Sequence, residues 1–216
     1  MDFVLSDIEI RVLGSLVEKE ITTPEYYPLS LNALTNACNQ KSNRDPVVDY
    51  DEGEVRDALY DLKEKDLAIT CEGIRVFKYD NYFADKLALS PPEVAVMCIL
   101  MLRGPQTPGE IRNRTDRLHA FEELSEVEAV LEGLASREGG PLVTKLPRQS
   151  GRKEHRYAHL LGGEVAPHFA EGAGQLDTPI ESACEKIERL EAQMEALLQE
   201  QAELKRELAE IRKLWE

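Results

Sequence analysis

The sequence predicts a mainly α protein with small β-hairpins, an α+β fold built from two similar domains and a C-terminal coiled-coil helix. Three observations support this prediction: an internal repeat with an offset of 84 residues, a switch from helical to alternating hydrophobic spacing within each copy, and heptads near the C-terminus. With 216 residues, of which 42% are apolar, the chain can bury a real core. We expect domains at 1–85 and 86–165, a flexible linker at 166–178 and the coiled-coil helix at 179–216.

The internal repeat is a domain duplication. The segment Leu5-Ser6-Asp7-Ile8-Glu9 returns as Leu89-Ser90-Pro91-Pro92-Glu93, and Thr23-Pro24 returns as Thr107-Pro108. A single offset fits all these pairs, which argues against chance coincidence. The shift of 84 residues also exceeds the period of about 20 to 50 that is typical of solenoid repeats. The two copies should therefore share one fold.

Each copy opens with a capped helix. Ser6 with Glu9, and Ser90 with Glu93, have the spacing of a capping box. In this motif the serine hydroxyl accepts a hydrogen bond from the backbone N–H of the glutamate, and the glutamate carboxylate accepts one from the backbone N–H of the serine. Pro91 suits the first helical position, because the N–H that it lacks would have no helical partner there. We therefore expect a first helix after each of these caps.

Two further helices are predicted in each copy. Ser30 and Thr107 precede the second helices, and Asp51 and Ser125 precede the third. After the third caps, apolar residues recur at helical spacing. These apolar positions are Val55, Leu59 and Leu62 in the first copy and Val127, Val130, Leu131 and Leu134 in the second.

Each copy ends in a predicted β-hairpin. In the first, residues 67–71 face residues 74–76 across a two-residue turn at Glu72-Gly73, where glycine can adopt the positive φ of a type I′ turn. In the second, residues 142–146 and 155–161 form longer arms. Three helices and a hairpin make a winged helix, in which helices two and three form the helix-turn-helix and the hairpin is the wing.

Several long motifs resemble the bacterial YceH family. They are the run Thr22-Thr23-Pro24-Glu25-Tyr26-Tyr27-Pro28-Leu29-Ser30, the stretch Ala37-Cys38-Asn39-Gln40-Lys41-Ser42-Asn43-Arg44-Asp45-Pro46-Val47, and Leu102-Arg103-Gly104-Pro105-Gln106-Thr107-Pro108-Gly109-Glu110. The resemblance covers roughly residues 1–165. It implies tandem winged helices in a cytoplasmic bacterial protein, and it brings no catalytic residues and no settled biochemical role.

Charge is distributed unevenly along the chain. The net charge is −15, made up of −9 over residues 1–85, zero over 86–165 and −6 over 166–216. Because salt screens exposed charges beyond about 8 Å, an acidic first domain leaves room for a basic patch on a second one. The predicted nucleic-acid patch lies on the second helix and the wing of the second copy; the alternative is a solvated, charged hairpin. Its cations are Arg112, Arg114, Arg117, Lys145, Arg148, Arg152, Lys153 and Arg156.

The third helices, which would read bases in a helix-turn-helix protein, are acidic. Groove-reading helices present Arg, Lys, Asn or Gln near their N-termini. Here the first copy offers Glu52, Gly53, Glu54, Arg56 and Asp57, and the second offers Glu126, Glu128 and Glu132. Direct base readout through these helices is therefore disfavoured.

The first copy carries ten extra residues between its second and third helices. The distance from Pro24 to Asp51 is 27 residues, whereas that from Pro108 to Ser125 is 17. The extra residues fall largely in the polar segment 38–50, which is either a partner-contact loop or a solvated connection. The predicted contact residues are Lys41, Asn43, Arg44, Tyr26 and Tyr27.

The C-terminal segment carries five heptads, which predict a left-handed coiled coil and a parallel homodimer. Three opposite-charge pairs at flanking positions, such as Lys186 with Glu191, agree with this arrangement. The alternative is a helix that folds back on its own chain. The predicted dimerisation residues are Ile187, Leu190, Met194, Leu197, Gln201, Leu204, Leu208 and Ile211.

No motif indicates catalysis, a metal site or a cofactor. The sequence contains neither a P-loop nor GxSxG nor HExxH, and its histidines do not form a ligand set. The cysteines have no CxxC spacing, so we expect thiols in a reducing compartment. With no apolar run long enough to span a bilayer, the expected location is the cytoplasm.

Two functions remain open from the sequence. The first is a dimeric, non-enzymatic protein that binds double-stranded DNA or regulates transcription, an expectation that depends on fold-level association. The alternative is a protein-interaction adaptor, whose acidic third helices meet a basic protein partner and whose 38–50 loop supplies anchors.

Overall fold

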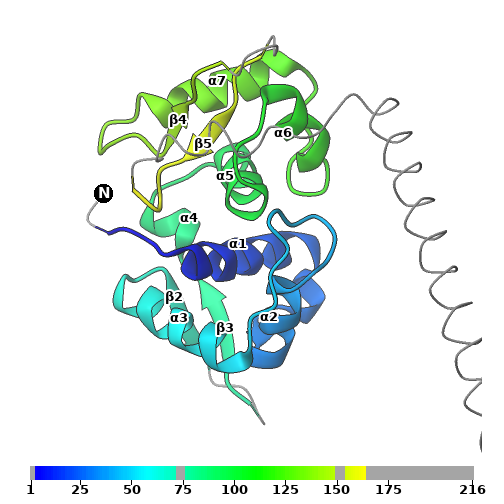
Figure 1. Cartoon of the computed structure of the whole chain (residues 1–216), viewed down its shortest axis with the longest axis vertical. Coiled ribbons are helices and arrows are strands. Elements are labelled where there is room, and N and C mark those ends of the chain that lie inside the picture. The colour runs from blue at the N-terminus through cyan, green and yellow to red at the C-terminus, as the bar shows by residue number, and fades with distance from the viewer. Residues whose placement is uncertain (1–2, 72–75, 149–153, 164–216) are drawn as a thin grey trace, which may run out of the picture. The chain divides into compact units, whose positions relative to one another are not determined.

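The computed structural model describes residues 3–71, 76–148 and 154–163, all of which fall in one compact unit, Met1–Pro167. The predicted linker at 166–178, the coiled-coil helix at 179–216 and its dimerisation residues lie outside the described residues. Within the described part, helices alternate with small antiparallel sheets, which confirms the α+β class (Figure 1).

Both copies share an order of three helices followed by a two-stranded hairpin. The first comprises α1 (Asp7–Thr22), η1 (Pro24–Tyr26), β1 (Leu29–Ser30), α2 (Leu31–Cys38), α3 (Glu52–Glu64), β2 (Ala68–Cys71), β3 (Lys78–Asn81) and α4 (Phe83–Lys86). The second comprises α5 (Pro91–Arg103), α6 (Pro108–Thr115), α7 (Leu124–Ala135), β4 (Val143–Lys145) and β5 (Tyr157–His159). The first copy contains η1, β1 and α4 in addition to the shared order.

The predicted capping boxes of the first helices are present. At the start of α1, the backbone N–H of Ser6 donates to Glu9 Oε2 at 2.8 Å, and the same reciprocal pattern starts α5 at Ser90. The predicted cap of α7 at Ser125 is wrong, because α7 begins at Leu124 and Glu123 occupies the cap position. Close to this start, the carboxylate of Glu126 accepts a hydrogen bond from the backbone N–H of Glu122 at 3.0 Å.

The first hairpin has a different register from the predicted one. Strand order is β1-β3-β2, and Cys71 pairs with Lys78, so residues 72–77 connect the strands and the two-residue turn at Glu72-Gly73 is wrong. Val76, predicted as a strand position, is exposed in this connection together with Phe77.

The register of β3 follows from its two neighbours and from one tyrosine. Tyr79 pairs with Leu29 of β1 on one side and with Thr70 of β2 on the other. Asn81 donates from its backbone and its side chain to the hydroxyl of Tyr27, at 3.1 and 2.9 Å. With a two-residue turn, Cys71 would pair with Ile74, but these long-range contacts hold β3 so that Cys71 pairs with Lys78, four residues further along.

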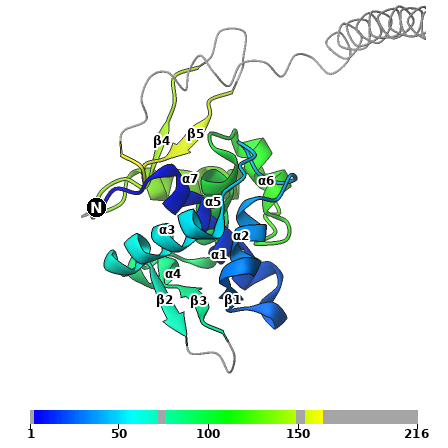
Figure 2. The ribbon, with the colours of Figure 1, turned by 60° about the horizontal axis from the view of Figure 1, so that its bottom comes forward.

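The second hairpin matches the predicted arms. Val143 pairs with His159 and Lys145 with Tyr157. Gln106, between α5 and α6, forms a bridge to Tyr157 with backbone bonds of 3.0 and 2.8 Å, in the position that β1 occupies in the first copy. Figure 2 shows this hairpin and β2–β3 at opposite ends of the unit.

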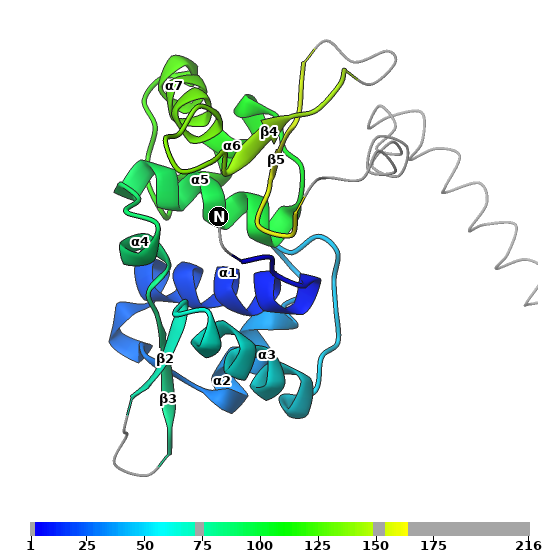
Figure 3. The same cartoon turned by 90° about the vertical axis from the view of Figure 1, so that its left-hand side faces the viewer.

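The two copies pack against each other through α1 and α5, which lie side by side in the middle of the unit (Figure 3). The Sγ atom of Cys98 lies 3.7 Å from the carbonyl oxygen of Gly14. These two positions are 84 residues apart, so the repeats meet at equivalent points. A Cβ on Gly14 would lie 3.0 Å from Cδ2 of Leu102, which shows how closely the helices approach. The predicted domains 1–85 and 86–165 therefore share one core.

Candidate nucleic-acid interface and the 39–50 loop

The predicted basic patch divides into exposed and engaged cations. Arg112 and Arg117, from the α6 region, and Lys145 and Arg148, from the hairpin, are exposed and take part in no ion pair within the described residues. Two further members of the patch, Arg152 and Lys153, lie outside the described residues.

Arg156 is an engaged cation that joins the hairpin to α6. Its guanidinium donates to both carboxylate oxygens of Glu110, at 2.8 and 2.9 Å, and to the carbonyl of Pro105 at 2.7 Å. Glu110 also accepts from the backbone of Thr107 at the start of α6. Because a carboxylate already compensates its charge, Arg156 does not belong with the free cations of the predicted patch.

Arg114 is neither fully exposed nor engaged in an ion pair among the described residues. It is half-buried and donates to the side-chain oxygen of Gln106, while the amide nitrogen of Gln106 donates to the carbonyl of Arg103 at 2.9 Å.

On the hairpin, Nζ of Lys145 lies 5.9 Å from the ring centroid of Tyr157. A shallow pocket of about 200 Å³ lies between these elements, lined by Pro108, Gly109, Leu124, Glu128, Lys145, Glu154, His155 and Tyr157.

The exposed surface of α7 is acidic, as predicted for the third helix. Between residues 122 and 132 it presents Glu side chains to solvent and no cation. Carboxylates repel phosphate, so this helix is unsuited to lie in a DNA groove. The exposed acidic residues are Glu122, Glu123, Glu126, Glu128 and Glu132.

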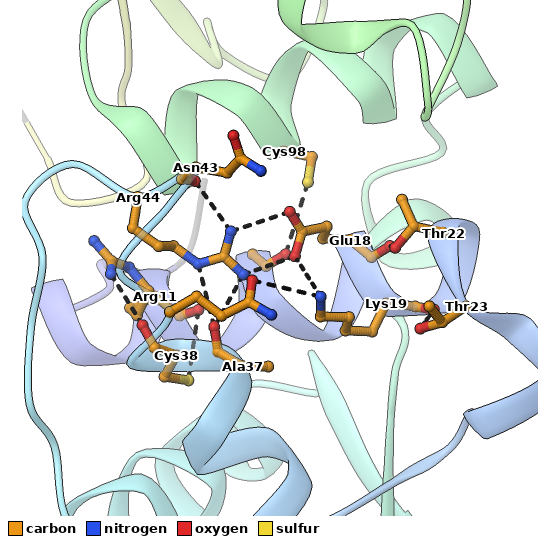
Figure 4. A network of polar contacts seen from close by, with 12 residues as sticks. Arg11, Glu18, Lys19, Thr22, Thr23, Ala37, Cys38, Asn43, Arg44 and Cys98 are labelled. Carbon is orange, nitrogen blue, oxygen red and sulfur yellow. Dashed lines mark hydrogen bonds and ion pairs between the residues drawn. The ribbon is translucent and has the colours of Figure 1, made fainter.

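The 39–50 loop encloses a buried ion pair (Figure 4). The side chain of Arg44 is 0% exposed, and its Nη1 and Nη2 donate to the carboxylate of Glu18 at 3.0 and 2.7 Å. Its Nε and Nη2 also donate to the carbonyl of Ala37, at 3.2 and 2.9 Å. In this structure Arg44 is therefore an internal anchor of the loop and is not presented to a partner, which corrects its predicted place on the contact surface.

The ends of the loop are closed by one asparagine. The side chain of Asn39 donates to the carbonyl of Tyr50 at 2.7 Å and accepts from its backbone N–H at 2.9 Å. From α1, Arg11 donates to the carbonyls of Cys38 and Pro46, at 3.2 and 2.6 Å. A compact loop with joined ends and its own internal contacts is an Ω-loop in form.

The crown of the loop contacts the second copy. The backbone N–H of Asp45 donates to the carbonyl of Leu102 at 2.9 Å, and Arg103 donates to the side-chain oxygen of Asn43. The extra residues of the first copy thus lie at the junction of the two copies.

The other predicted contact residues differ in exposure. Lys41 and Asn43 are exposed on the loop, and Tyr26, on η1, is 72% exposed. Tyr27 is half-buried, because its hydroxyl accepts from Asn81. A contact role for the exposed three stays a prediction.

The contacts around the buried ion pair shift the pKa values of Glu18 and Arg11. Burial opposes ionisation of Glu18, but the bonds and charge of Arg44, helped by Lys19, outweigh it and hold the pKa of Glu18 below its ordinary value. Burial, and then repulsion from Arg44, lower the pKa of Arg11. Arg44 is therefore the arginine that pairs with Glu18, whereas Arg11 is held by the carbonyls of Cys38 and Pro46.

Sequence reasoning missed the roles of Arg11 and Glu18. Both are charged residues within the helix α1, seven positions apart and therefore on one face, next to buried apolar residues. That pattern was the available signal, since buried charges need partners.

Among the described residues, no group of three or more His, Cys, Asp or Glu side chains is placed to hold a metal ion. No helix in the described ranges has the length and apolar character needed to cross a membrane.

Comparison with known proteins places the chain in a family. The family model described as "Protein of unknown function, DUF480" matches residues 5–152. A "UPF0502 protein" of Pelobacter propionicus is 54% identical over 210 residues, covering 95% of both chains. A second, from Geotalea uraniireducens, is 52% identical and the match covers 100% of both chains. A third, from Opitutus terrae, is 57% identical, and the match covers 79% of this chain and 75% of the relative. These matches confirm the YceH resemblance, and the chain belongs to this bacterial family, DUF480 or UPF0502.

Proposed function

We propose that the protein is a non-enzymatic binder of double-stranded DNA, made of two winged-helix units, that holds DNA by phosphate contacts from its second half. The order of elements supports this proposal. In each half a helix, a short strand or bridge, two helices and a hairpin follow one another, which is the winged-helix order.

The observation that carries the proposal is the set of exposed cations on two adjoining elements. Arg112 lies on α6 and Arg117 follows it by two residues, while Lys145 ends β4 and Arg148 follows it by three residues. The bond between Arg156 and Glu110 and the bridge between Gln106 and Tyr157 hold the hairpin against α6. The cations therefore belong to one region of the surface.

Binding should be electrostatic and largely independent of sequence. Four phosphate contacts would give a slope of about −3.6 in log affinity per decade of salt, since each neutralised phosphate contributes roughly −0.9. Because α7 is acidic, it is not suited to contact base edges in a groove. The cations therefore position the duplex through contacts to its phosphate backbone.

A dimer would double the contacts on one duplex. The heptads of residues 180–215 favour a parallel homodimer, which we include in the proposal. Two linked binding surfaces bind more tightly than one, because the second contact becomes intramolecular. A cytoplasmic location is likewise part of the proposal.

Fluorescence anisotropy with a mixed-sequence duplex across a salt series tests the proposal. The variant Arg112→Glu with Arg148→Glu should bind at least tenfold more weakly than wild type at low salt. The matched control, Arg56→Glu with Lys63→Glu, changes the net charge equally but alters exposed cations on α3. Absence of wild-type binding at low salt, or equal losses in both variants, would overturn the proposal.

A protein adaptor remains the second candidate, and the acidic surface of α7 favours it. A basic protein partner would meet this surface, with Leu124 exposed at its start. Replacing Glu126 and Glu132 by Gln should weaken such a partner and strengthen DNA binding, because the change removes two negative charges. Surface plasmon resonance with both ligand types would separate the two candidates.

A further inference from the structure

We propose that the junction of the two halves holds a second phosphate-contact site, formed by Arg103 and Arg114 and completed by Lys41. Arg103 ends α5, Arg114 lies on α6, and Lys41 belongs to the 39–50 loop. The inference rests on the proposed function, because its ligand is the phosphate backbone of double-stranded DNA.

Hydrogen bonds hold the two guanidinium groups to the residues around the end of α5 and to the loop. Arg103 donates to Oδ1 of Asn43, and Arg114 donates to Oε1 of Gln106. Gln106 in turn donates to the carbonyls of Arg103 and Pro105, at 2.9 and 3.0 Å. Residues 103–106 therefore hold both arginines and join them to the loop.

The charges of Arg103 and Arg114 are at most partly compensated within the described part of the chain, because Glu18 and Asp45 attract Arg103 without forming an ion pair with it. Their hydrogen-bond acceptors are neutral amide oxygens, and neither arginine forms an ion pair there. Two carboxylates in this region already have partners. Glu18 is bound to Arg44 at 2.7 Å, and Glu110 is bound to Arg156 at 2.8 Å.

The positive charges also act on one another. Burial, followed by repulsion from Arg114 and Arg44, lowers the pKa of Arg103, and attraction by Glu18 and Asp45 offsets this only in part. Arg103 still carries its charge at neutral pH, because the ordinary pKa of arginine is far above 7. An anion at this place would relieve the repulsion.

Both guanidinium groups have free donors that a phosphate can use. Each side chain is half-exposed and donates one hydrogen bond within the described residues, while a guanidinium has five N–H donors. The planar fork of arginine matches two phosphate oxygens. The junction thus offers partly exposed guanidinium donors of the kind that bind phosphate.

The first half contributes to this site through the loop. The bond from Asp45 to Leu102 and the bond from Arg103 to Asn43 hold the crown of the loop against the end of α5. Lys41, two residues before Asn43, is exposed there. The site is therefore complete only when the two halves are packed together, and it extends the DNA-contact surface beyond the hairpin.

Salt-dependent DNA binding by the full chain tests this site. The variant Arg103→Gln with Arg114→Gln should reduce the steepness of the log affinity against log salt plot by about 1.8, because two phosphate contacts are lost. Lys41→Gln alone should reduce it by about 0.9. The matched control, Arg56→Gln with Lys63→Gln, removes the same number of charges from α3 and should leave the slope unchanged.

A second variant separates the site from a folding defect. Arg103→Lys with Arg114→Lys keeps both charges, so it should bind DNA with the wild-type slope. If wild type binds but the glutamine variant keeps its slope, or changes only as much as the control, the junction site is wrong while the proposed function stands. Failure of wild type to bind at low salt would overturn both. A slope lost in the glutamine and lysine variants alike would also count against a charge-based site.

Discussion

At the scale of single residues, Arg44 shows how a loop residue becomes part of the core. It lies in a polar, turn-rich segment, yet its side chain is fully enclosed and paired with Glu18. A buried charge is costly unless it is paired and hydrogen-bonded, and Arg44 satisfies this with the carbonyl of Ala37 as well. The ion pair therefore fixes the loop to α1 and α2.

Removing one partner should destabilise the protein strongly. We expect Arg44→Met to lower the free energy of unfolding by about 3–5 kcal/mol, because Glu18 is left charged and unpaired in a largely buried place. Urea unfolding at pH 7 measures this change. The double variant Arg44→Met with Glu18→Leu should recover much of the loss; a double variant as unstable as the sum of the singles would show that the pair is not coupled.

His159 should make stability depend on pH. Burial lowers its pKa to about 4, below the ordinary value of 6.5, with Asp7 opposing the shift weakly. Between these values the unfolded chain binds a proton that the folded chain does not, so stability falls as the pH decreases from 6.5 towards 4. The lowered pKa of Glu18 acts in a separate window, because its contribution is lost only as the pH falls below the ordinary 4.5.

The histidine contribution can be isolated by substitution. Urea midpoints of wild type should decrease between pH 7.5 and pH 5, and His159→Gln should show a smaller decrease over the same interval. An identical pH dependence in the two proteins would assign the effect to other groups.

At the scale of elements, the approach of α1 and α5 sets the tolerance for side-chain size. The Cβ of any residue at position 14 would lie 3.1 Å from Cβ of Met101, which is part of a rigid helix. Overpacking of a core usually costs about 1–3 kcal/mol. Gly14 therefore has a packing role, even though glycine is unfavourable within a helix.

Two glycines in helices should respond in opposite ways to larger residues. Gly14→Val should lower the free energy of unfolding by at least about 1 kcal/mol, because it forces α1 and α5 apart. Gly133→Ala, on the exposed side of α7 with no atom within 4 Å of its Cβ, should raise it by roughly 0.5–1 kcal/mol through helix propensity. Thermal unfolding by circular dichroism compares the two, and a neutral Gly14→Val would contradict the close approach.

At the scale of the whole molecule, the two halves form one body. α1 and α5 share a core, the loop of the first half bonds to Leu102, and Leu5 donates to the carbonyl of Leu161 at 2.8 Å. The acidic first half and the second half with its basic surface are therefore not independent domains. A DNA-contact surface on the second half can include residues of the first.

The proposed dimer should depend on the C-terminal heptads and not on this body. The full chain of 24.4 kDa should have twice that mass in light scattering, whereas a truncation ending at Gln175 should have the mass of one chain. The compact unit Met1–Pro167 is intact in that truncation. A truncated protein that still has the mass of two chains would place the interface within the compact unit.

The sequence by itself determined those features that depend on local chemistry. The capping boxes at Ser6 and Ser90 and the arms of the second hairpin follow from spacing, propensity and turn residues, which act over a few positions. The repeat offset likewise predicted two copies that share three helices and a hairpin.

The tertiary structure decided what depends on distant partners. Strand β3 takes its register from β1 and Tyr27, and α1 packs on α5 at Gly14. Arg44 and Arg156, which the sequence presents as free cations, are neutralised by Glu18 and Glu110. The reason is physical: a charge in a polar segment looks solvated in sequence, and only the fold brings up the carboxylate that makes its burial favourable.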